Sequence, residues 1–428
     1  MKGNGIKKIK MILKPESIKL LLKLNGIMKK DGNYSLKKGV KAIKFILDGE
    51  KIAEHDGEFV ISTFMPPFPS RAFETYLTAV DNIEDSPFTK HIHSKRTAPI
   101  SFYLSVTSKC NLNCSHCSEK NRNNKTELNT EQWIETIGKI QDMKTSIVGI
   151  TGGEPLMRKD IIEIISSIDS RSSSILFTNG YLMTEELALS FKKSGLFGIG
   201  ISIDSAEEEI HNSNRGNPHS YEKAIEAVKL SVKAGLYTMF QTMVPRSRVN
   251  FSEITELAEL AKRLGANEIK LLEPIRSGRY LIEKEICEEK VFYDKKTRND
   301  LINIQHELNN CGKYPKISSF PYTESDEKYG CGAGTQHSYI NSCGDLYPCD
   351  FVPLKFGNVL DKDIAVLWKE MNKAIGNPKR LCFANCMNRH LISSGDFSLP
   401  KETGFSKEFC EKNQENDFPG FYRYMQSL

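Results

Sequence analysis

The sequence lacks any long hydrophobic run. No stretch approaches the ~20 consecutive apolar residues that a transmembrane helix needs. Near the N-terminus, Lys14, Lys19 and Lys23 interrupt every segment that could serve as the apolar region of a signal peptide. We therefore expect a cytoplasmic protein.

The chain also has little net charge. Its 428 residues carry 59 Lys and Arg against 54 Asp and Glu, a formal net charge of +5. Residues 1–51 hold 14 lysines and 4 acids, which is +10, so the remainder carries 45 basic and 50 acidic residues, which is −5. This balance argues against a nucleic-acid partner bound through bulk charge. It confines any attraction to an anionic surface to the N-terminus.

Cysteine, in contrast, is plentiful. Eleven cysteines in a reducing compartment indicate metal or redox chemistry rather than a disulfide framework. The remaining composition, 39% hydrophobic and 26% charged, is typical of a globular protein with a large core.

Strand and helix patterns alternate through the middle of the chain. We expect strands at 101–107, 146–153, 174–180, 197–204, 237–244 and 268–274, a helix that begins at Thr130, and helices at 160–168, 184–195, 220–235 and 252–265. The repeated β-then-α order predicts a parallel sheet with right-handed crossovers. Six units are too few for a closed eight-stranded barrel, so we predict a partial (β/α)6 barrel of the α/β class, with its chemistry at the carboxyl ends of the strands.

The composition changes along the chain in a way that suggests five regions. We expect a basic N-terminal α+β extension at 1–98, the partial barrel at 99–282, a helical connector at 283–325, a small Cys-rich domain at 326–412 and a tail at 413–428.

Three cysteines follow the first expected strand. Cys110, Cys114 and Cys117 have the spacing C-x3-C-x2-C. Three thiolates can hold three corners of an iron–sulfur cluster and leave one iron open, whereas four thiolates close it. The alternatives are a zinc site completed by a residue such as His116, or three unrelated thiols. Zinc sites prefer paired C-x2-4-C motifs and four ligands.

Together with ThrGlyGlyGluPro at 151–155, after the second strand, the triplet resembles the radical S-adenosylmethionine (radical SAM) enzymes. The resemblance implies that Cys110, Cys114 and Cys117 hold a [4Fe–4S] cluster whose open iron binds S-adenosylmethionine. In that family, reductive cleavage of the sulfonium gives a 5′-deoxyadenosyl radical, which abstracts a hydrogen atom from substrate.

The resemblance also implies roles for the second motif and for other strand-end residues. Glycines allow close backbone approach, and a glutamate can accept a hydrogen bond from the methionine ammonium. The expected cofactor-binding residues are His116, Thr151, Gly152, Gly153, Glu154, Pro155, Thr178, Asn179, Ser202, Asp204 and Arg215. For Thr178, Asn179, Ser202 and Asp204 the alternative is ordinary turn chemistry, and for Arg215 it is an exposed surface position.

A second group of cysteines lies near the C-terminus. Cys331, Gly344 and Cys349 have the spacing C-x12-G-x4-C, and Gly344 with Asp345 is typical of a hairpin turn. Four thiolates here could close a second iron–sulfur cluster, and zinc is the alternative.

This spacing resembles the SPASM extension of radical SAM enzymes and its shorter twitch version, as do GlyAsnValLeu at 357–360 and Trp368. The full pattern has more cysteines than this chain, so the resemblance implies a single auxiliary cluster. Its expected ligands are Cys331, Cys349, Cys382 and Cys386, with Cys343 or Cys410 as substitutes. Cys287 and Cys311 are expected to be ordinary thiols.

The basic N-terminus lies outside this resemblance. A helix from Pro15 would place Ile18, Leu21, Leu22 and Met28 in one apolar stripe. We favour a surface helix docked on the barrel with a solvated lysine face, and the alternative is peripheral contact with an anionic membrane. The segment 64–73 is expected to be a strap over the barrel or a partner-binding segment.

The resemblance implies an enzyme that oxidatively modifies or cross-links a peptide or protein side chain, served by a flavodoxin- or ferredoxin-like electron donor. The same chemistry on a lipid or a small metabolite is one alternative. A non-catalytic iron–sulfur carrier or scaffold is another. The intact triplet with its second motif argues against a carrier, because a carrier needs no open iron.

Overall fold

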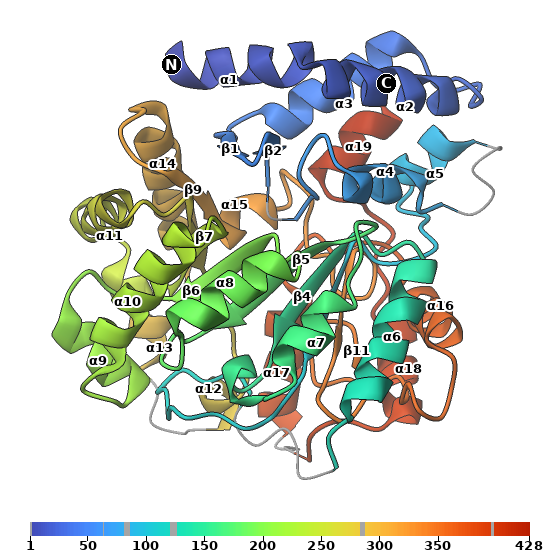
Figure 1. The fold of residues 1–428 in the computed structure, drawn as a ribbon. Helices are drawn as coiled ribbons and strands as arrows, with labels where there is room; N and C mark the ends of the chain where they lie inside the picture. The colour runs from blue at the N-terminus through green and yellow to red at the C-terminus, as the bar shows by residue number, and fades with distance from the viewer. Residues whose placement is uncertain (1, 63, 81–85, 120–125, 283–286, 395–397) are drawn as a thin grey trace.

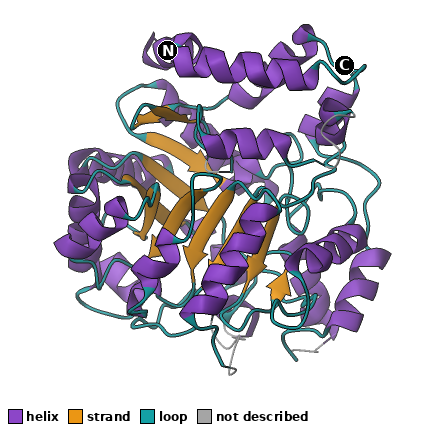
Figure 2. Ribbon diagram, turned by 45° about the vertical axis from the view of Figure 1, so that its right-hand side comes forward, coloured by secondary structure: helices purple, strands orange, loops and turns teal. Residues whose placement is uncertain are grey.

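A nine-stranded sheet forms the centre of the computed structural model, which describes residues 2–62, 64–80, 86–119, 126–282, 287–394 and 398–428 (Figures 1 and 2). The strand order is β11-β10-β3-β4-β5-β6-β7-β8-β9. The strands of this sheet are β3 (Ser101–Ser105), β4 (Ile147–Thr151), β5 (Ser173–Thr178), β6 (Gly198–Ser202), β7 (Tyr237–Met243), β8 (Glu268–Leu272), β9 (Lys316–Ser319), β10 (His337–Ile340) and β11 (Leu346–Tyr347).

The six strands from β3 to β8 pair in parallel and in sequence order, which confirms the predicted α/β fold class. Side chains alternate between the two faces of each strand. Phe102 and Leu104 of β3, for example, join the core beneath the helices, whereas Tyr103 packs on Phe177 at the concave face. We call the space enclosed by this concave face the barrel interior.

Helices separate the strands and cover the convex face of the sheet (Figure 1). They are α6 (Thr130–Asp142), α7 (Ile161–Ser166), α8 (Glu185–Lys193), α9 (Glu208–Arg215), α10 (Ser220–Lys233) and α11 (Phe251–Leu264), with short 3-10 turns η1 (Pro155–Met157) and η2 (Arg246–Arg248). The helix expected from residue 130 is present, and its N-cap is Asn129, which forms a capping box with Gln132.

Two further strands extend the sheet beyond the six expected units. β9 lies in the segment expected to be a helical connector and pairs in parallel with β8. Its Lys316 is buried because Glu50, from the N-terminal region, pairs with it at 3.1 Å. β10, from the Cys-rich region, pairs in parallel with β3. The helix α12 (Arg279–Ile282) directly precedes the connector, and the connector itself also holds α13 (Glu288–Val291), α14 (Lys295–Asn310) and α15 (Phe320–Thr323). Residues 283–286 lie outside the described chain.

The N-terminal region covers the amino ends of the strands, at the top of Figure 1. It consists of α1 (Lys2–Leu13), α2 (Pro15–Met28), α3 (Leu36–Leu47), the hairpin β1 (Ala53–His55) and β2 (Glu58–Val60), α4 (Arg71–Thr78) and α5 (Pro87–Ile92). Ala53 and Val60 of the hairpin pack with Ile147 and Tyr237, the first residues of β4 and β7. The 64–73 segment is a strap, because its Met65 and Phe68 are buried beneath α1 and α2.

The Cys-rich region closes the other side of the sheet. β10 and β11 form the expected antiparallel hairpin, and Gly344 in its turn has a φ of +85°, which favours glycine. The helices α16 (Ile364–Ile375), α17 (Phe383–Ser394), α18 (Thr403–Lys412) and α19 (Gly420–Gln426) follow. None of the described helices has both the length and the hydrophobicity to cross a bilayer.

Candidate active site

The loop after β3 carries the cysteine triplet. Cys110 is exposed, and Cys114 and Cys117 are half-buried. The three thiols lie near enough for their charges to interact, and burial raises the pKa of Cys110 to about 11. Three thiols on one short irregular loop are a suitable donor set for three corners of an iron–sulfur cluster.

The two glycines of the second motif let the tip of β4 pack against the start of this loop. The backbone N–H of Gly153 donates to the Thr107 carbonyl at 2.7 Å, and that of Glu154 donates to the Lys109 carbonyl at 2.8 Å. A Cβ on Gly152 would overlap the Thr107 carbonyl oxygen, and a Cβ on Gly153 would overlap that of Lys109. Both positions therefore need glycine because the backbone of residues 107–109, just before Cys110, leaves no room for a side chain.

Glu154 is buried and links the tips of β4 and β5. One carboxylate oxygen accepts from the Thr178 hydroxyl at 2.6 Å and from the Leu156 N–H at 3.0 Å, and the other accepts from the Asn179 N–H at 2.7 Å. Burial raises the pKa of Glu154, although these hydrogen bonds act in the opposite direction. The structure thus gives this carboxylate a positioning role. Its expected contact with an ammonium stays a prediction.

A buried ion pair stands beside Cys114. Arg215, at the end of α9, donates to both carboxylate oxygens of Asp204 at 2.8 and 2.6 Å, and its other nitrogen lies 3.9 Å from the Cys114 sulfur. Burial alone would raise the pKa of Asp204, but the charge and the hydrogen bonds of Arg215 outweigh it and the pKa is lowered. Arg215 is therefore a buried residue of the site, which excludes the alternative of an exposed surface position.

Two further segments hold the triplet loop. Glu127 accepts hydrogen bonds from the Ser108 N–H at 2.6 Å and from the Thr107 hydroxyl at 3.0 Å. From the other side, the Arg279 N–H donates to the Cys117 carbonyl at 3.0 Å, and a Cβ on Gly278 would overlap that same carbonyl. The loop is thus held at both ends by backbone contacts that leave the thiol side of Cys110 exposed.

The polar groups around the loop fit S-adenosylmethionine in number and kind. Among the described residues, the buried Nδ2 of Asn111 and Nδ1 of His116 have no hydrogen-bond partner. Burial lowers the pKa of His116 to about 4, so its ring is neutral at pH 7. Thr151 and Ser202 end their strands, and Pro155 begins η1. All the predicted barrel residues therefore lie at the carboxyl ends of β3 to β6, and their individual contacts stay predictions.

The four predicted auxiliary ligands also lie together. The thiols of Cys331 and Cys382 share a hydrogen bond. Cys349 and Cys386 also lie near enough to Cys331 for its charge to affect their pKa values. The hydrogen bond from Cys382, supported by nearby Lys379, lowers the pKa of Cys331 to about 7. This donor set fits a closed cluster.

The remaining cysteines lie elsewhere. Cys343 is buried in the hairpin turn, Cys410 is buried on α18, and Cys287 and Cys311 are exposed. Lys379 lies near Cys410 as well as near Cys331 and Cys386. The choice of Cys343 or Cys410 as a substitute ligand stays open.

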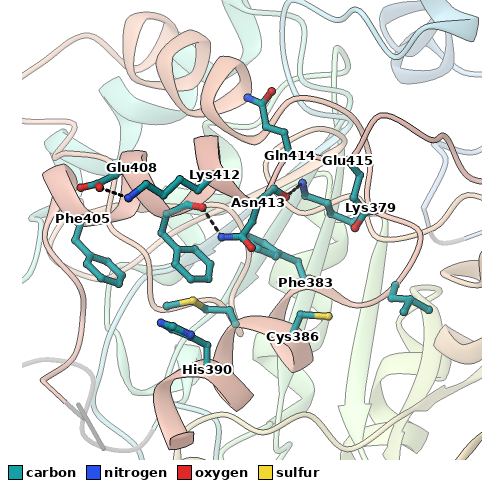
Figure 3. Close-up of a pocket in the computed structure, with 13 residues that line it drawn as sticks. Lys379, Phe383, Cys386, His390, Phe405, Glu408, Lys412, Asn413, Gln414 and Glu415 are labelled. Atoms are coloured by element: carbon teal, nitrogen blue, oxygen red, sulfur yellow. Dashed lines mark hydrogen bonds and ion pairs between the residues drawn. The ribbon is translucent and has the colours of Figure 1, made fainter. Parts of the chain in front are cut away.

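A hollow of about 730 Å³ lies beside Cys386, between α17 and α18 (Figure 3). Phe383, His390, Phe405 and Phe409 supply much of its wall. Cys386 is the one cysteine among the described residues that line it.

Hydrogen bonds also link the segments that follow the cysteine triplet and the auxiliary cysteines to other parts of the barrel. Glu119, two residues after Cys117, accepts from the Tyr339 hydroxyl of β10 at 2.9 Å. Asn388, two residues after Cys386, is fully buried. Its amide donates to the Arg276 carbonyl and, at 3.3 Å, to the Phe351 carbonyl.

The barrel interior between these groups contains polar side chains. The ligand atoms of His337, Cys349 and Asp350 lie within 4.8 Å of one another. Cys349 and Asp350 are also near Tyr103 at the concave face of β3. On the opposite strands, Gln241 pairs with Lys270 in register, and the Gln241 Oε1 has no partner among the described residues.

Lys270 is only 1% exposed, and no hydrogen bond or ion pair holds its ammonium within the described chain. Its nitrogen lies 4.8 and 5.0 Å from the ring centroids of Phe64 and Phe320. Burial lowers its pKa to about 8, against the charges of Glu268, Glu324 and Asp350.

Replacing Lys270 with methionine is expected to stabilise the protein at neutral pH. The folded-state pKa lies below the unfolded value, so the unfolded state binds more protons between pH 8 and 10.5 and wild-type stability rises with pH there. The variant should gain about 1–3 kcal/mol below pH 8, and the gain should fade at higher pH. Thermal unfolding of both proteins at pH 7 and at pH 9.5 measures this, and an unchanged difference would contradict it.

The sequence does not reveal several of these residues. Asn111, Glu127, Lys270, Gly278 and Asn388 carry no local motif, because their partners lie far away in the chain. One residue of the site could have been inferred from the sequence: Asp350, an acid that directly follows the predicted ligand Cys349.

Comparisons with known proteins agree with this geometry. Residues 104–261 match the model of the Radical SAM superfamily, and residues 331–388 match that of the SPASM iron–sulfur cluster-binding domain. The chain is 27% identical to an AdoMet-dependent heme synthase from Methanosarcina barkeri, over 70% of this chain and 94% of the relative. It is 30% identical to the mycofactocin maturase MftC of Mycolicibacterium smegmatis, over 61% and 68%.

The fold resembles that of SuiB from Streptococcus suis, solved with its precursor peptide SuiA, with a TM-score of 0.54 at 17% identity over 66% of this chain and 67% of that one. The regions that match the two family models contain the cysteine triplet and the four predicted auxiliary ligands, respectively. The protein is therefore an enzyme that uses S-adenosylmethionine, a [4Fe–4S] cluster and an auxiliary iron–sulfur cluster. The chain belongs to the radical SAM superfamily and carries a SPASM domain.

Proposed function

We propose that this enzyme removes a hydrogen atom from an unactivated C–H bond of a peptide or protein side chain, and that the auxiliary cluster accepts the second electron. The product would be an oxidised or cross-linked side chain. The mycofactocin maturase relative and the fold likeness to SuiB, solved with a precursor peptide, support a peptide substrate.

One observation carries the oxidative part of this proposal. Both thiol groups border the same barrel interior, joined by the hydrogen bond between Tyr339 and Glu119 and by those of Asn388. A substrate held in that interior would lie between the hydrogen-abstracting site and a closed cluster. Closed clusters are suited to electron transfer because they have no open iron.

When bound, S-adenosylmethionine and its cluster supply hydrogen-atom abstraction, and the auxiliary cluster supplies a one-electron acceptor. The chain's own residues have three tasks. Cys110, Cys114 and Cys117 hold the first cluster, and Cys331, Cys349, Cys382 and Cys386 hold the second. The buried ion pair of Arg215 and Asp204 holds the Arg215 guanidinium in place next to Cys114.

Oxidation of a C–H bond also releases a proton. In a net oxidation the substrate would lose a hydrogen atom, an electron and a proton; the bound cofactors would take up the first two, and the protein must supply a base for the proton. Asp350 is suited to accept that proton, because it lies beside Cys349 and its carboxylate is 3.4 Å from the His337 ring nitrogen. An external flavodoxin- or ferredoxin-like protein would supply the first electron.

A small metabolite is the second candidate substrate. The heme synthase relative aligns over 94% of its own length, compared with 68% for the maturase. The similarity therefore extends through nearly the whole of that relative. A lipid substrate is the third alternative.

The proposal is tested by deuterium transfer. Cells that carry the gene are grown on deuterated medium, and their peptide, small-molecule and lipid fractions are offered separately to the reconstituted, reduced enzyme with S-adenosylmethionine. Deuterium should appear in 5′-deoxyadenosine with the peptide fraction, and not when the Cys110→Ala variant replaces the enzyme. Transfer only from the small-molecule or lipid fraction would overturn the peptide proposal and select the alternative.

A further inference from the structure

Large apolar side chains gather on the surface of the first three helices. Half of the large hydrophobic residues that are exposed in the described chain fall between residues 6 and 43, about a tenth of the sequence. They are Ile6, Ile9, Ile12, Leu13, Ile18, Leu22, Leu36, Val40 and Ile43. Single exposed apolar residues are ordinary, but a contiguous group marks a surface that contacts something else.

Helix α1 is turned with its lysines toward the protein. The ammonium groups of Lys7 and Lys8 donate to the carbonyls of Ile52 and Leu47 at 3.4 and 3.0 Å. The opposite side presents Ile6, Ile9 and Leu13, which are 65%, 60% and 65% exposed. A surface helix of a water-soluble protein normally points its apolar face inward and its lysines toward solvent. The predicted docked helix with a solvated lysine face begins at Pro15 and is therefore α2, for which it stays a prediction; α1 instead presents an aliphatic face to solvent.

Helices α2 and α3 add similar stripes. Leu22 of α2 is 67% exposed, and Ile18 lies one turn before it. On α3, Leu36, Val40 and Ile43 are exposed at the spacing i, i+4, i+7, which places them on one face. Two residues of the predicted α2 stripe, Leu21 and Met28, instead pack inward, as does Leu24, which was not part of that stripe.

The surface between these stripes is strongly basic. Of the four acids in residues 1–51, Asp31 and Glu50 are buried, which leaves only Glu16 and Asp48 at the surface. Exposed lysines include Lys19, Lys29, Lys37 and Lys44. An aliphatic face with a lysine border matches the boundary between headgroups and acyl chains of an anionic bilayer.

We propose that α1, α2 and α3 hold the enzyme on an anionic membrane surface. This layer covers the amino ends of the strands, and the triplet loop, which follows β3, lies at the opposite, carboxyl ends (Figure 1). The mouth of the barrel therefore faces the aqueous phase while the enzyme is bound. The inference is independent of the substrate proposal, and it does not require a substrate taken from the bilayer.

A second copy of the chain fits this surface less well. Residues 1–51 carry 14 lysines and 4 acids, so two such faces would bring like charges together. Lipid headgroups of opposite charge remove this repulsion. The aliphatic residues then enter the membrane without a matching groove.

The test is flotation of the full-length protein with vesicles. The wild type should float with vesicles of phosphatidylcholine and phosphatidylglycerol, and about tenfold less with phosphatidylcholine alone or at high salt. The double variant Ile9→Glu with Leu13→Glu should lose about tenfold or more of this binding. Replacing Lys19 and Lys37 with glutamine should weaken binding only to the anionic vesicles.

Leu189→Glu, an equally exposed leucine on α8, is the matched control and should bind like the wild type. All variants should keep the wild-type thermal unfolding curve and yield of 5′-deoxyadenosine, because none of these residues lies near the cysteines. Absence of wild-type binding to anionic vesicles would overturn the proposal. So would equal binding by the Ile9/Leu13 variant, or a wild-type dimer in solution that this variant dissociates.

Discussion

Gly153→Ala is expected to reduce the formation of 5′-deoxyadenosine by about hundredfold or more, because displacement of a reacting group by about 1 Å has an effect of that size. The added Cβ would overlap the backbone of Ser108 and Lys109. That backbone cannot move aside alone, since the Glu154 N–H is bonded to the Lys109 carbonyl at 2.8 Å and the Gly153 N–H to the preceding Thr107 carbonyl at 2.7 Å. The whole Cys110 loop must shift instead.

Gly138→Ala is the matched control for this substitution. Gly138 lies inside α6, and nothing lies within 4 Å of the position where its Cβ would be. Alanine there should leave activity unchanged and stabilise the helix by about 0.5–1 kcal/mol. Product, iron content and the cluster absorbance should be measured for both variants. Wild-type activity in Gly153→Ala would show that the loop does not depend on this contact.

Cys331→Ala should separate the two halves of the reaction. The variant should still form 5′-deoxyadenosine, because the triplet loop is intact, but its yield of oxidised substrate should fall by about hundredfold. The reason is that Cys331 is the thiol shared by the contacts of Cys382, Cys349 and Cys386. Without it, the auxiliary cluster has only three thiolates and loses its closed form.

The control for this second prediction is Cys311→Ala. Cys311 is an exposed thiol at the end of α14, and its removal should change neither iron content nor products. Cys343→Ala and Cys410→Ala, measured alongside, identify which of them, if either, is a ligand. Oxidised product at full yield from Cys331→Ala would contradict the electron-accepting role of the auxiliary cluster.

The central fold could be predicted because its signals are local. Each β-then-α unit between residues 101 and 272 has its own strand pattern, and glycines such as Gly195 and Gly265 follow the helices with positive φ. The strand β9 could not be predicted in this way. Its KISS sequence contains a lysine that is buried only because Glu50, far away in the chain, neutralises it. The hairpin that contains β10 was expected, but the pairing of β10 with β3 was not, because it joins segments more than two hundred residues apart.

For the site, too, the contiguous motifs could be predicted and the contacts between distant segments could not. The triplet and the second motif are contiguous, so their positions after β3 and β4 followed from the sequence. The purpose of Gly152 and Gly153 did not, because their close neighbour is the chain's own backbone. The links made by Asn388 and by Tyr339 with Glu119 join segments that only the folded chain brings together. The orientation of α1 likewise depends on carbonyl groups of later residues.

The central claim is that the triplet loop binds a cluster that cleaves S-adenosylmethionine. The direct measurement is anaerobic reconstitution with iron and sulfide, followed by reduction and quantification of 5′-deoxyadenosine. The intact protein should form it, and a variant with alanine at Cys110, Cys114 and Cys117 should form none while it keeps its auxiliary cluster. Equal yields from the two proteins, or no product from intact protein shown to hold both clusters and supplied with the peptide fraction, would contradict the account.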